Sequence, residues 1–521
     1  MSQSTSFSAT PNLATVNFGQ RPISLEQVVS VAKGAPVKLN ETPEYQEYIQ
    51  KGARFIDSLL NEEGVVYGVT TGYGDSCTVT VGLDLVHELP LHLSRFHGCG
   101  LGDIFSPMQS RAIMACRLNS LAVGKSGVTY ELLQRIELLL NLDITPVIPE
   151  EGSVGASGDL TPLSYLAAVL IGERDVVYQG KRRATKEVYA ELNIVPLTLR
   201  PKEGLALMNG TAVMTALACL AFDRAQYLAR LSSRITAMAS LTLKGNSNHF
   251  DDILFDAKPH PGQNQIAAWI REDLNHHTHP RNSDRLQDRY SIRCAPHIIG
   301  VLQDALPFMR QFIETELNSA NDNPIVDGEG EHILHGGHFY GGHIAFVMDS
   351  MKNTVANLAD LIDRQMALVM DTKFNNGLPA NLSAAVGARQ AINHGFKAVQ
   401  IGVSAWTAEA LKNTMPASVF SRSTECHNQD KVSMGTIAAR DCMRVLQLTE
   451  QVAAAALLAM TQGIHLRIAQ NELAQDSLTP SLAKTVAQVS EDFELLTEDR
   501  PLEAVLRQTV EKIQLGQWEV C

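Results

Sequence analysis

Clustered basic residues are scarce in this sequence, and their scarcity excludes one class of partner. The chain has 43 Lys and Arg against 56 Asp and Glu, which gives a formal net charge of -13 over 521 residues. Nucleic-acid binding depends on Lys and Arg grouped together to neutralise phosphates, and no basic stripe stands out. We therefore expect no nucleic-acid partner.

The cysteines lack any pairing pattern. They lie at 77, 99, 116, 219, 294, 426, 442 and 521. Without a Cys-x-x-Cys pair or a regular spacing, neither a disulfide framework nor a thiolate zinc site is indicated, and a reducing cytoplasm is the simplest environment. The N-terminal stretch also lacks the basic and apolar segments that a secretory signal needs.

Long apolar runs are missing as well. The most apolar run, 452 to 460, is about half of the roughly 20 residues that cross a bilayer, so we expect no membrane span. His332, His335 and His338 recur every third residue, and three more histidines cluster at 276 to 279. The first set lies in a Gly-rich loop without a nearby Cys or carboxylate trio, so we expect no metal.

Two kinds of pattern divide the chain. Residues from about 20 to 200 mix short helices with β-like runs at 65 to 71 and 175 to 180, punctuated by Gly and Pro. From about 205 onward, apolar residues recur at helical spacing, and one stripe consists of Met348, Met351, Val355, Leu358, Ile362 and Met366. Similar stretches at 299 to 318, 385 to 412 and 434 to 461 indicate long helices packed as a bundle.

These patterns predict a mainly α protein, a long up-down helical bundle with a smaller α+β N-terminal part. We expect four regions, given in chain order. They are a tail at 1 to 20, an α+β domain at 21 to 204, a long-helix bundle at 205 to 470 and a C-terminal helical region at 471 to 521. Gly/Asn/Pro/His-rich loops interrupt the helices, and such loops on a rigid scaffold are where chemistry concentrates.

The most informative stretch is GSVGASGDLTPLSYLAAVLIGE, residues 152 to 173. Taken alone, it is typical of a Gly-rich turn entering a helix, with Ser157 or Asp159 as the cap. A phosphate loop is a weaker alternative, because the Lys and Ser/Thr that follow the glycines in such a loop are absent.

This stretch resembles the histidine, phenylalanine and tyrosine ammonia-lyases and their aminomutase relatives, and the resemblance covers nearly the whole chain. It implies the fumarase/aspartase-like lyase fold. It also implies that Ala156, Ser157 and Gly158 cyclise into a 4-methylidene-imidazole-5-one, so that no external cofactor is needed. The residue types suit that chemistry, since the Gly158 nitrogen can attack the Ala156 carbonyl unhindered and loss of the Ser157 hydroxyl leaves an electrophilic methylidene.

Further motifs match the family, and they imply the rest of the site. The catalytic set comes from YGVTTGYG, EGLALMNGT and LQDRYSIRCAP, and it comprises Tyr67, Asn209 and Tyr290. The substrate-binding set implied by these and later motifs is Gly74, His97, Gln287, Arg293, Asn323, Phe339, Glu409 and Gln429.

The resemblance also implies the mechanism. The substrate amine adds to the methylidene and becomes a good leaving group, which is covalent catalysis supplied by the backbone. Tyr67 takes the β-proton as a phenolate, which Arg293 and helix N-termini could favour, and Arg293 clamps the substrate carboxylate. Elimination then yields the α,β-unsaturated acid and ammonia.

The identity of the substrate ring depends on His97, because imidazole can hydrogen-bond a phenol or another imidazole. Tyrosine, giving p-coumarate, is the first expectation and histidine, giving urocanate, the second, followed by an aromatic aminomutase reaction. Glu409 matches an acidic position used by histidine lyases, but other members also carry Glu there. Gly98 is smaller than the Leu of some tyrosine lyases, so extra ring substituents are expected to fit.

The family also implies a homotetramer whose active sites are shared between subunits. Two rival hypotheses remain. One is a helical scaffold that has kept this fold and lost its chemistry, and the other is a metal-free lyase of the fumarase type, which needs no backbone cyclisation. The rivals differ in whether the chain loses two waters and whether Ser157 is needed for activity.

Overall fold

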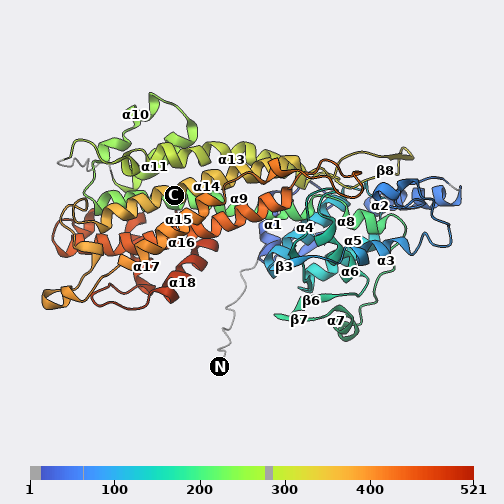
Figure 1. Ribbon diagram of the computed structural model, residues 1–521, viewed down its shortest axis with the longest axis horizontal. Coiled ribbons are helices and arrows are strands. Elements are labelled where there is room, and N and C mark those ends of the chain that lie inside the picture. The colour runs from blue at the N-terminus through green and yellow to red at the C-terminus, as the bar shows by residue number, and fades with distance from the viewer. Residues whose placement is uncertain (1–12, 63, 276–284, 521) are drawn as a thin grey trace. The chain divides into compact units, whose positions relative to one another are not determined.

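The computed structural model describes residues 13–62, 64–275 and 285–520 (Figure 1). The chain forms two compact units, each assembled from three separate segments. The first unit comprises residues 1–220, 310–348 and 416–440, and the second comprises 221–309, 349–415 and 441–521. Four of the five boundaries fall inside long helices: α9 (Ala212–Thr242), α13 (Ala295–Leu317), α14 (Gly342–Met370) and α16 (Gly435–Ala469).

The first unit contains short helices and small sheets. Its shorter helices are α1 (Leu25–Ala32), α2 (Pro43–Asn61), α3 (Leu89–Phe96), α4 (Pro107–Ala122), α5 (Tyr130–Asn141), α6 (Leu160–Leu170), α7 (Thr185–Leu192) and α8 (Glu203–Met208), with 3-10 turns η1 (Gly74–Thr78) and η5 (Ala417–Phe420). Strand β1 (Val16–Phe18) pairs parallel with β2 (Val37–Leu39). The other pairings are antiparallel: β3 (Leu101–Ile104) with β5 (Pro149–Glu151), β6 (Asp175–Tyr178) with β4 (Thr145–Pro146) and β7 (Lys181–Ala184), and β8 (Ile325–Asp327) with β9 (His332–Leu334).

The β-like run at 175 to 180 is confirmed as β6, whereas the strand predicted at 65 to 71 is wrong. Residues 66–70 form a turn, in which Val66 N donates to Thr70 Oγ1 at 2.9 Å and Thr70 Oγ1 donates to Gly64 O at 3.1 Å. Gly68 has a φ of +65°. Side-chain hydrogen bonds to the backbone thus replace a strand ladder, as Thr allows. The turn buries Val66 and Val69 and leaves Tyr67 half-buried.

Helix α4 is the centre of the first unit. Pro107 and a capping box between Ser106 and Gln109 begin it, and every residue from Ser110 to Ala122 is buried. It contacts α1, α5 and α8. A helix buried on all faces has no polar side, so its two arginines, Arg111 and Arg117, must find hydrogen-bond acceptors in the interior.

The second unit contains the long helices. Besides its parts of α9, α13, α14 and α16, it holds α10 (Asp252–Asp256), α11 (Pro261–Asp273), α12 (Tyr290–Arg293), α15 (Lys397–Lys412), α17 (Pro480–Asp492) and α18 (Glu503–Gln514), with 3-10 turns η2 (Ser247–Phe250), η3 (Ala380–Leu382), η4 (Gly387–Ala391) and η6 (Gln475–Ser477). The mainly α prediction is confirmed. Every residue of the predicted stripe from Met348 to Met366 is buried.

One predicted helix begins later than expected. The periodic stretch at 385 to 412 forms α15 only from Lys397. Gly387 and Gly395 have φ values of +58° and +53°, which interrupt a right-handed helix, and a Cβ at Gly395 would collide with Asn381 O. Apolar periodicity alone did not reveal these backbone turns.

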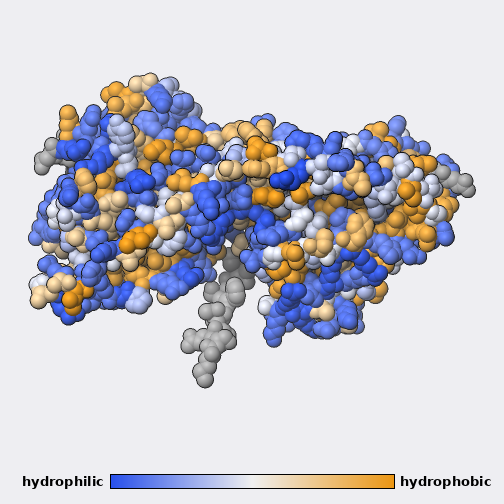
Figure 2. All heavy atoms as spheres, viewed as in Figure 1, coloured by the Kyte–Doolittle hydropathy of each residue, from blue (hydrophilic) through white to orange (hydrophobic). Residues whose placement is uncertain are grey.

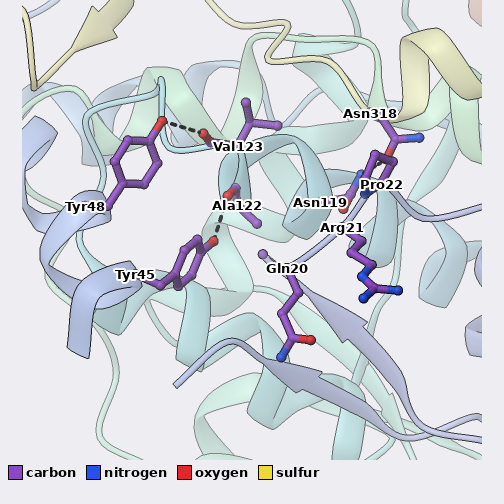
Figure 3. A pocket seen from close by; sticks show the side chains of 10 residues that line it. Gln20, Arg21, Pro22, Tyr45, Tyr48, Asn119, Ala122, Val123 and Asn318 are labelled. Carbon is purple, nitrogen blue, oxygen red and sulfur yellow. Dashed lines mark hydrogen bonds between the residues drawn. The ribbon is translucent and has the colours of Figure 1, made fainter. Parts of the chain in front are cut away.

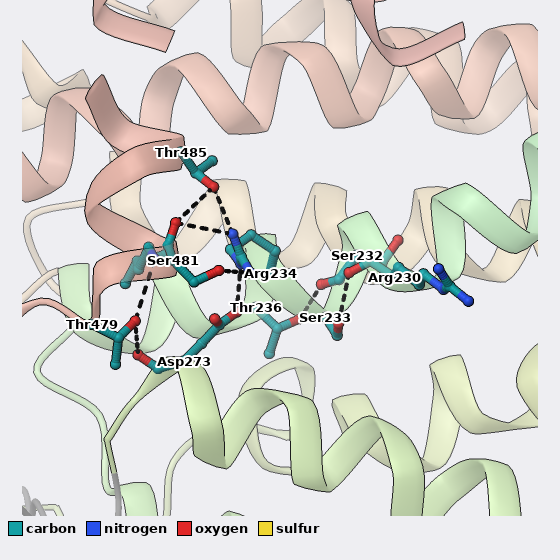
Figure 4. Close-up of polar contacts among 10 residues, drawn as sticks. Arg230, Ser232, Ser233, Arg234, Thr236, Asp273, Thr479, Ser481 and Thr485 are labelled. Carbon is teal, nitrogen blue, oxygen red and sulfur yellow. Dashed lines mark hydrogen bonds and ion pairs between the residues drawn. The ribbon is translucent and has the colours of Figure 1, made fainter. Parts of the chain in front are cut away.

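Arg234 joins three helices of the second unit (Figure 4). From α9 its guanidinium donates to Asp273 Oδ2 of α11 at 2.6 Å, and to Ser481 Oγ and Thr485 Oγ1 of α17 at 2.7 and 2.6 Å. Arg234 and Asp273 are both buried. Several acceptors around one buried cation compensate its loss of hydration, so the network connects α9, α11 and α17.

Helix α16 is, among the described helices, the one long and apolar enough to cross a membrane by length and composition. Its most apolar window is 78% buried within the protein, which is the burial of a core helix. On the face shown in Figure 2, apolar side chains are interspersed with polar ones.

Candidate active site

The tripeptide of Ala156, Ser157 and Gly158 lies in the loop between β5 and α6. A second segment, residues 209 and 210, holds it by hydrogen bonds, and we call it the gripped tripeptide. The Ser157 carbonyl oxygen accepts from Asn209 Nδ2 at 3.2 Å and from Gly210 N at 3.1 Å. Asp159 N donates to Gly210 O at 2.8 Å. Gly158 and Gly210 therefore pair as in a parallel β-bridge, although about 50 residues separate them in the chain.

Both positions of this bridge need glycine, because a side chain at either one would overlap neighbouring atoms. Gly158 has a φ of +72° and Gly210 a φ of +135°. A Cβ atom at Gly158 would overlap the Gly210 carbonyl, and one at Gly210 would overlap Arg117 and Asn321. Only a residue without a side chain can hold either position unstrained.

Asp159 does not cap the helix that follows it. At the N-cap of α6 its side chain makes no capping hydrogen bond. The fully buried carboxylate instead accepts from Val213 N and Met214 N, in the first turn of α9, at 3.1 and 3.0 Å. Ser153 Oγ at 3.1 Å and Thr436 Oγ1 also donate to it. The capping interpretation from the sequence is thus wrong for α6, because α9 offers better-placed donors.

The opposing effects on Asp159 can be separated. Burial raises the pKa of its carboxyl group above the ordinary value, while the hydrogen bonds from Thr436, Met214, Ser153 and Val213 lower it. The N-terminus of α9 contributes a partial positive charge at the same place. Asp159 directly follows the tripeptide, so its hydrogen bonds connect the tripeptide to the start of α9.

Tyr67 lies beside Gly74 and Glu425. Its hydroxyl oxygen accepts from Gly74 N at 2.8 Å, and Glu425 accepts from Asp75 N at 2.9 and 3.0 Å. Burial is the largest cause that raises the pKa of Tyr67, and the negative charge of Glu425 adds to it, while the Gly74 hydrogen bond lowers it. The first unit by itself therefore favours the phenol over the phenolate.

Gln429 contacts the tripeptide directly. Its Nε2 donates to Ser157 Oγ at 3.4 Å, and its Oε1 accepts from Thr424 Oγ1 at 3.0 Å. Asn323 Oδ1 accepts from Gly336 N at 2.8 Å, which fixes the loop that leads to half-buried Phe339. Of the site residues predicted from sequence, Asn209 and Gln429 form hydrogen bonds with the tripeptide.

His97 is half-buried at the end of α3, and its hydrogen bond determines its tautomer. Its Nδ1 lies 3.0 Å from Leu93 O, and because a carbonyl only accepts, we assign the proton to Nδ1. Burial is the main cause that lowers the pKa of His97, and Arg174 lowers it further. The neutral imidazole therefore offers Nε2 as an acceptor.

Arg174 lies beside Gly98, the residue that follows His97. A Cβ atom at Gly98 would overlap the guanidinium of Arg174, which donates to Ser94 O and, at 3.0 Å, to Ser164 Oγ. Arg174, from the loop before β6, thus takes part of the space that a side chain at position 98 would need, and the fit of extra ring substituents stays a prediction.

Four predicted residues belong to the second unit. Gln287 is exposed and precedes α12, which carries Tyr290 and Arg293. Arg293 Nε donates to Asp288 O at 3.0 Å, and its guanidinium carbon lies 4.8 Å from the centre of the Tyr290 ring. Glu409 of α15 pairs with Arg444 at 2.6 Å, so its charge already has a partner.

Sequence reasoning missed the residues behind the tripeptide, above all Arg117, Gly210 and Asn321. One signal was available, since Arg117 lies between the apolar residues Ala115, Cys116 and Leu118. The pattern could not say which carbonyl the arginine would meet. Within the described residues no group of three His, Cys, Asp or Glu side chains could hold a metal, and the histidines at 276 to 279 lie outside the described residues.

A separate pocket in the first unit has a volume of about 330 Å³ (Figure 3). Tyr45 and Tyr48 line it, and their hydroxyls donate to Ala122 O and Val123 O at 2.7 and 3.1 Å. No predicted catalytic or substrate-binding residue lines it. The candidate site is therefore the gripped tripeptide and not this pocket.

The mainly helical fold and the Ala-Ser-Gly tripeptide agree with the class of lyase that the sequence motifs resemble. The family model described as aromatic amino acid lyase matches residues 23–491, so the chain belongs to the aromatic amino acid lyase family. The family expected from the sequence motifs is confirmed.

Relatives and solved structures agree with this assignment. Histidine ammonia-lyase of Homo sapiens is 38% identical over 456 residues, which are 85% of this chain and 68% of that protein. Histidine ammonia-lyase of a Geobacillus species is 35% identical over 91% of this chain and 92% of its own length. The crystal structure of tyrosine aminomutase from Streptomyces globisporus is similar with a TM-score of 0.88 and 34% identity, covering 97% of this chain and 98% of that one.

The space around Gly158 yields a prediction. Gly158→Ala should lower the free energy of unfolding by several kcal/mol, because it combines backbone strain with overlap of the Gly210 carbonyl. Gly180→Ala is the matched control, since Gly180 has nearly the same φ, +71°, and nothing within 4 Å. The control should cost about 1 kcal/mol. Urea unfolding measures both, and equal costs would contradict the overlap.

Proposed function

We propose that this lyase removes ammonia from an aromatic L-amino acid to give the α,β-unsaturated acid, with tyrosine converted to p-coumarate as the preferred reaction. The observation that carries the proposal is the grip on Ser157, whose carbonyl oxygen has two N–H donors and whose hydroxyl contacts Gln429. The second candidate is histidine conversion to urocanate, which is favoured by the similarity to two histidine ammonia-lyases at 38 and 35% identity.

The residues present fit a cyclised tripeptide. Gly158 has no side chain to hinder its nitrogen, and its positive φ is compatible with an unusual backbone path. Asn209 Oδ1 is buried without a hydrogen-bond partner among the described residues, as expected if it faces a group or substrate. As a 4-methylidene-imidazole-5-one, Ala156, Ser157 and Gly158 would supply an electrophile that makes the substrate amine a better leaving group.

The roles of the chain's own residues follow from their chemistry. Asn209 Nδ2 and Gly210 N would stabilise negative charge on the Ser157 oxygen, as donors of an oxyanion hole do. Asn209 Oδ1 would accept from the substrate ammonium. Tyr67 would take the β-proton, and Arg293 would bind the carboxylate as a bidentate donor. For Gly74, Gln287, Tyr290, Asn323 and Phe339 we propose contacts around the substrate.

The electrophile is tested by mass and activity together. The wild-type chain should weigh less than its encoded sequence by two water molecules, whereas Ser157→Ala should keep its full mass and lose turnover, because alanine has no hydroxyl to eliminate. Intact-mass spectrometry and the ultraviolet absorbance of the unsaturated acid measure the two effects. An active Ser157→Ala variant would favour a fumarase-type lyase, and full-mass, inactive wild type would favour the scaffold.

The pH dependence tests Tyr67. Because the pKa of Tyr67 is raised, kcat/KM should climb with pH as the phenolate forms. Glu425→Gln removes a charge that raises this pKa, so the rising limb of the plot of kcat/KM against pH should move to lower pH. Glu47→Gln is the control, since Glu47 pairs with Arg54 and does not contribute to the pKa of Tyr67. An unchanged limb in Glu425→Gln would mean that Tyr67 does not limit the rate.

The preference for tyrosine rests on His97 and Glu409. The His97 Nε2 acceptor suits a donor at the tip of the ring, either a phenol O–H or an imidazole N–H. Glu409, the position that would favour histidine, is already paired with Arg444. The similarity to tyrosine aminomutase supports a phenol as the ring, and it leaves an aminomutase reaction as a further alternative.

His97→Phe should lower kcat/KM for tyrosine and raise it for phenylalanine. A phenol hydroxyl that loses its buried partner costs on the order of 1 to 3 kcal/mol, whereas a plain phenyl ring fits an apolar wall without that cost. Parallel kinetics with tyrosine, phenylalanine and histidine measure the ratio. An unchanged ratio would make His97 a structural residue, and histidine as the fastest wild-type substrate would establish the second candidate.

A homotetramer with shared active sites is part of the proposal. In the second unit a pocket of about 780 Å³, lined by Val399, Trp406, Leu506 and Val510 among others, opens between α15, α16 and α18. Val386, Ile392 and Ile401 are exposed by 76%, 58% and 62%, which is apolar surface that subunit contacts would cover. An active monomer in sedimentation experiments would overturn this part.

A further inference from the structure

Arg117 lies behind the gripped tripeptide, in the buried helix α4. Its side chain is fully buried. Its Nη1 donates to Asn209 O at 2.7 Å, and its Nη2 donates to Ser120 Oγ at 2.6 Å and Asn321 Oδ1 at 3.1 Å. These acceptors are all neutral, although a buried guanidinium usually meets a carboxylate. One of its three acceptors is a peptide carbonyl, that of Asn209.

That peptide group is the one that holds Ser157. The Asn209 carbonyl and the Gly210 N–H belong to the same peptide bond, and they point in opposite directions. Arg117 contacts the carbonyl end, and Gly210 N donates to the Ser157 carbonyl oxygen at 3.1 Å at the other end. A cationic donor on a carbonyl polarises the amide, which makes its N–H a stronger donor.

We propose that Arg117 is a positioning residue that, acting through the Asn209 to Gly210 peptide, orients and strengthens the hydrogen bond to the Ser157 carbonyl oxygen. The inference rests on the proposed electrophile, whose carbonyl that oxygen would be. Arg117 needs no contact with the substrate. It sets how strongly the Ser157 oxygen is polarised, and so how readily the tripeptide matures and reacts.

The neighbours of Arg117 support an orienting role. Asn321 Oδ1 also accepts from Thr211 N at 3.4 Å, and Thr211 Oγ1 donates to Glu316 at 2.5 Å. Arg117 and Asn321 occupy the space where a Cβ at Gly210 would lie. Arg117 therefore holds the carbonyl of the Asn209 to Gly210 peptide, and Asn321 packs against Gly210. These contacts keep the Gly210 N–H directed at the Ser157 carbonyl oxygen.

Arg111 offers a matched control on the same helix. It is also buried, and its guanidinium donates to Val31 O and Leu140 O at 2.8 Å and to Ala35 O at 3.3 Å. Unlike Arg117, it also pairs with a carboxylate, Asp143, at 2.9 Å. Like Arg117 it places a cation on backbone carbonyls, but none of these carbonyls belongs to a residue that contacts the tripeptide. Loss of Arg111 should therefore affect stability without affecting Ser157.

The experiment compares Arg117→Met and Arg117→Lys with Arg111→Met and Arg111→Lys in the full chain. Four quantities are measured: thermal stability, the fraction of chains that have lost two waters, the ultraviolet absorption maximum of the dehydrated tripeptide, and kcat and KM. The absorption maximum reports polarisation of the Ser157 carbonyl, which a purely structural role would not change. Wild-type mass is measured first.

We expect Arg117→Met to lower the dehydrated fraction, to shift the absorption maximum, and to lower kcat by about 10- to 100-fold with KM changed less than about threefold. Arg117→Lys, which keeps a charge but not the fork of donors, should be intermediate. Both Arg111 variants should keep the wild-type dehydrated fraction, absorption maximum and kcat below their melting temperatures, even where they are less stable.

A wild-type dehydrated fraction, absorption maximum and kcat in folded Arg117→Met would overturn the proposal, as would equal changes in Arg111→Met. If both Arg117 variants fail to fold while both Arg111 variants fold, Arg117 serves stability and the proposal is wrong. A wild-type chain of full encoded mass would overturn the proposed function and this inference with it. A dehydrated wild type with unaffected Arg117 variants overturns only the inference.

Discussion

The pairing of Gly158 with Gly210 is the contact on which the rest of the site depends, because it fixes a loop that has no regular ladder of its own. One backbone segment both donates to the Ser157 carbonyl and accepts from the Asp159 amide. Such a contact needs two residues without side chains and a support that does not move. The support is buried on both sides of the pair: Asp159 is joined to the start of α9, and Arg117 reaches the Asn209 carbonyl from α4.

Burying so much charge beneath one loop is costly unless every group is paired. Lys202 and Asp322, both fully buried, form an ion pair at 2.5 Å, and Ser126 Oγ donates to Asp322 at 2.8 Å. Lys202 has a φ of +78° and directly precedes α8, the short helix that ends at Met208 and is followed by Asn209. The ion pair thus holds a strained turn in place, and that turn determines where the Asn209 side chain lies.

The surroundings of Tyr67, unlike those of the buried ion pair, disfavour a charge. They oppose the phenolate that the proposed role of Tyr67 requires. Burial and the nearby Glu425 carboxylate both raise its pKa, and one backbone N–H, from Gly74, works against them. A base with a raised pKa is stronger once deprotonated, but a smaller fraction of it is in that form at neutral pH. Gly74 has a φ of +60°, which favours glycine, and the Glu425 carboxylate lies where a Cβ atom would be, so the same turn places both groups near the phenol.

The sequence by itself determined the helical class, the buried stripe from Met348 to Met366 and the family, because apolar periodicity and contiguous motifs are local properties of the chain. It also pointed to Ser157, Asn209 and Gln429, which the structure brings into contact. Only the tertiary structure decided what holds them. Thr70 turned an expected strand into a turn, Arg174 took part of the space beside Gly98, and Arg117 found the Asn209 carbonyl 92 residues away. A buried polar group must be satisfied by whatever acceptor the packing brings near, and that acceptor is set by contacts between distant segments, which no local pattern encodes.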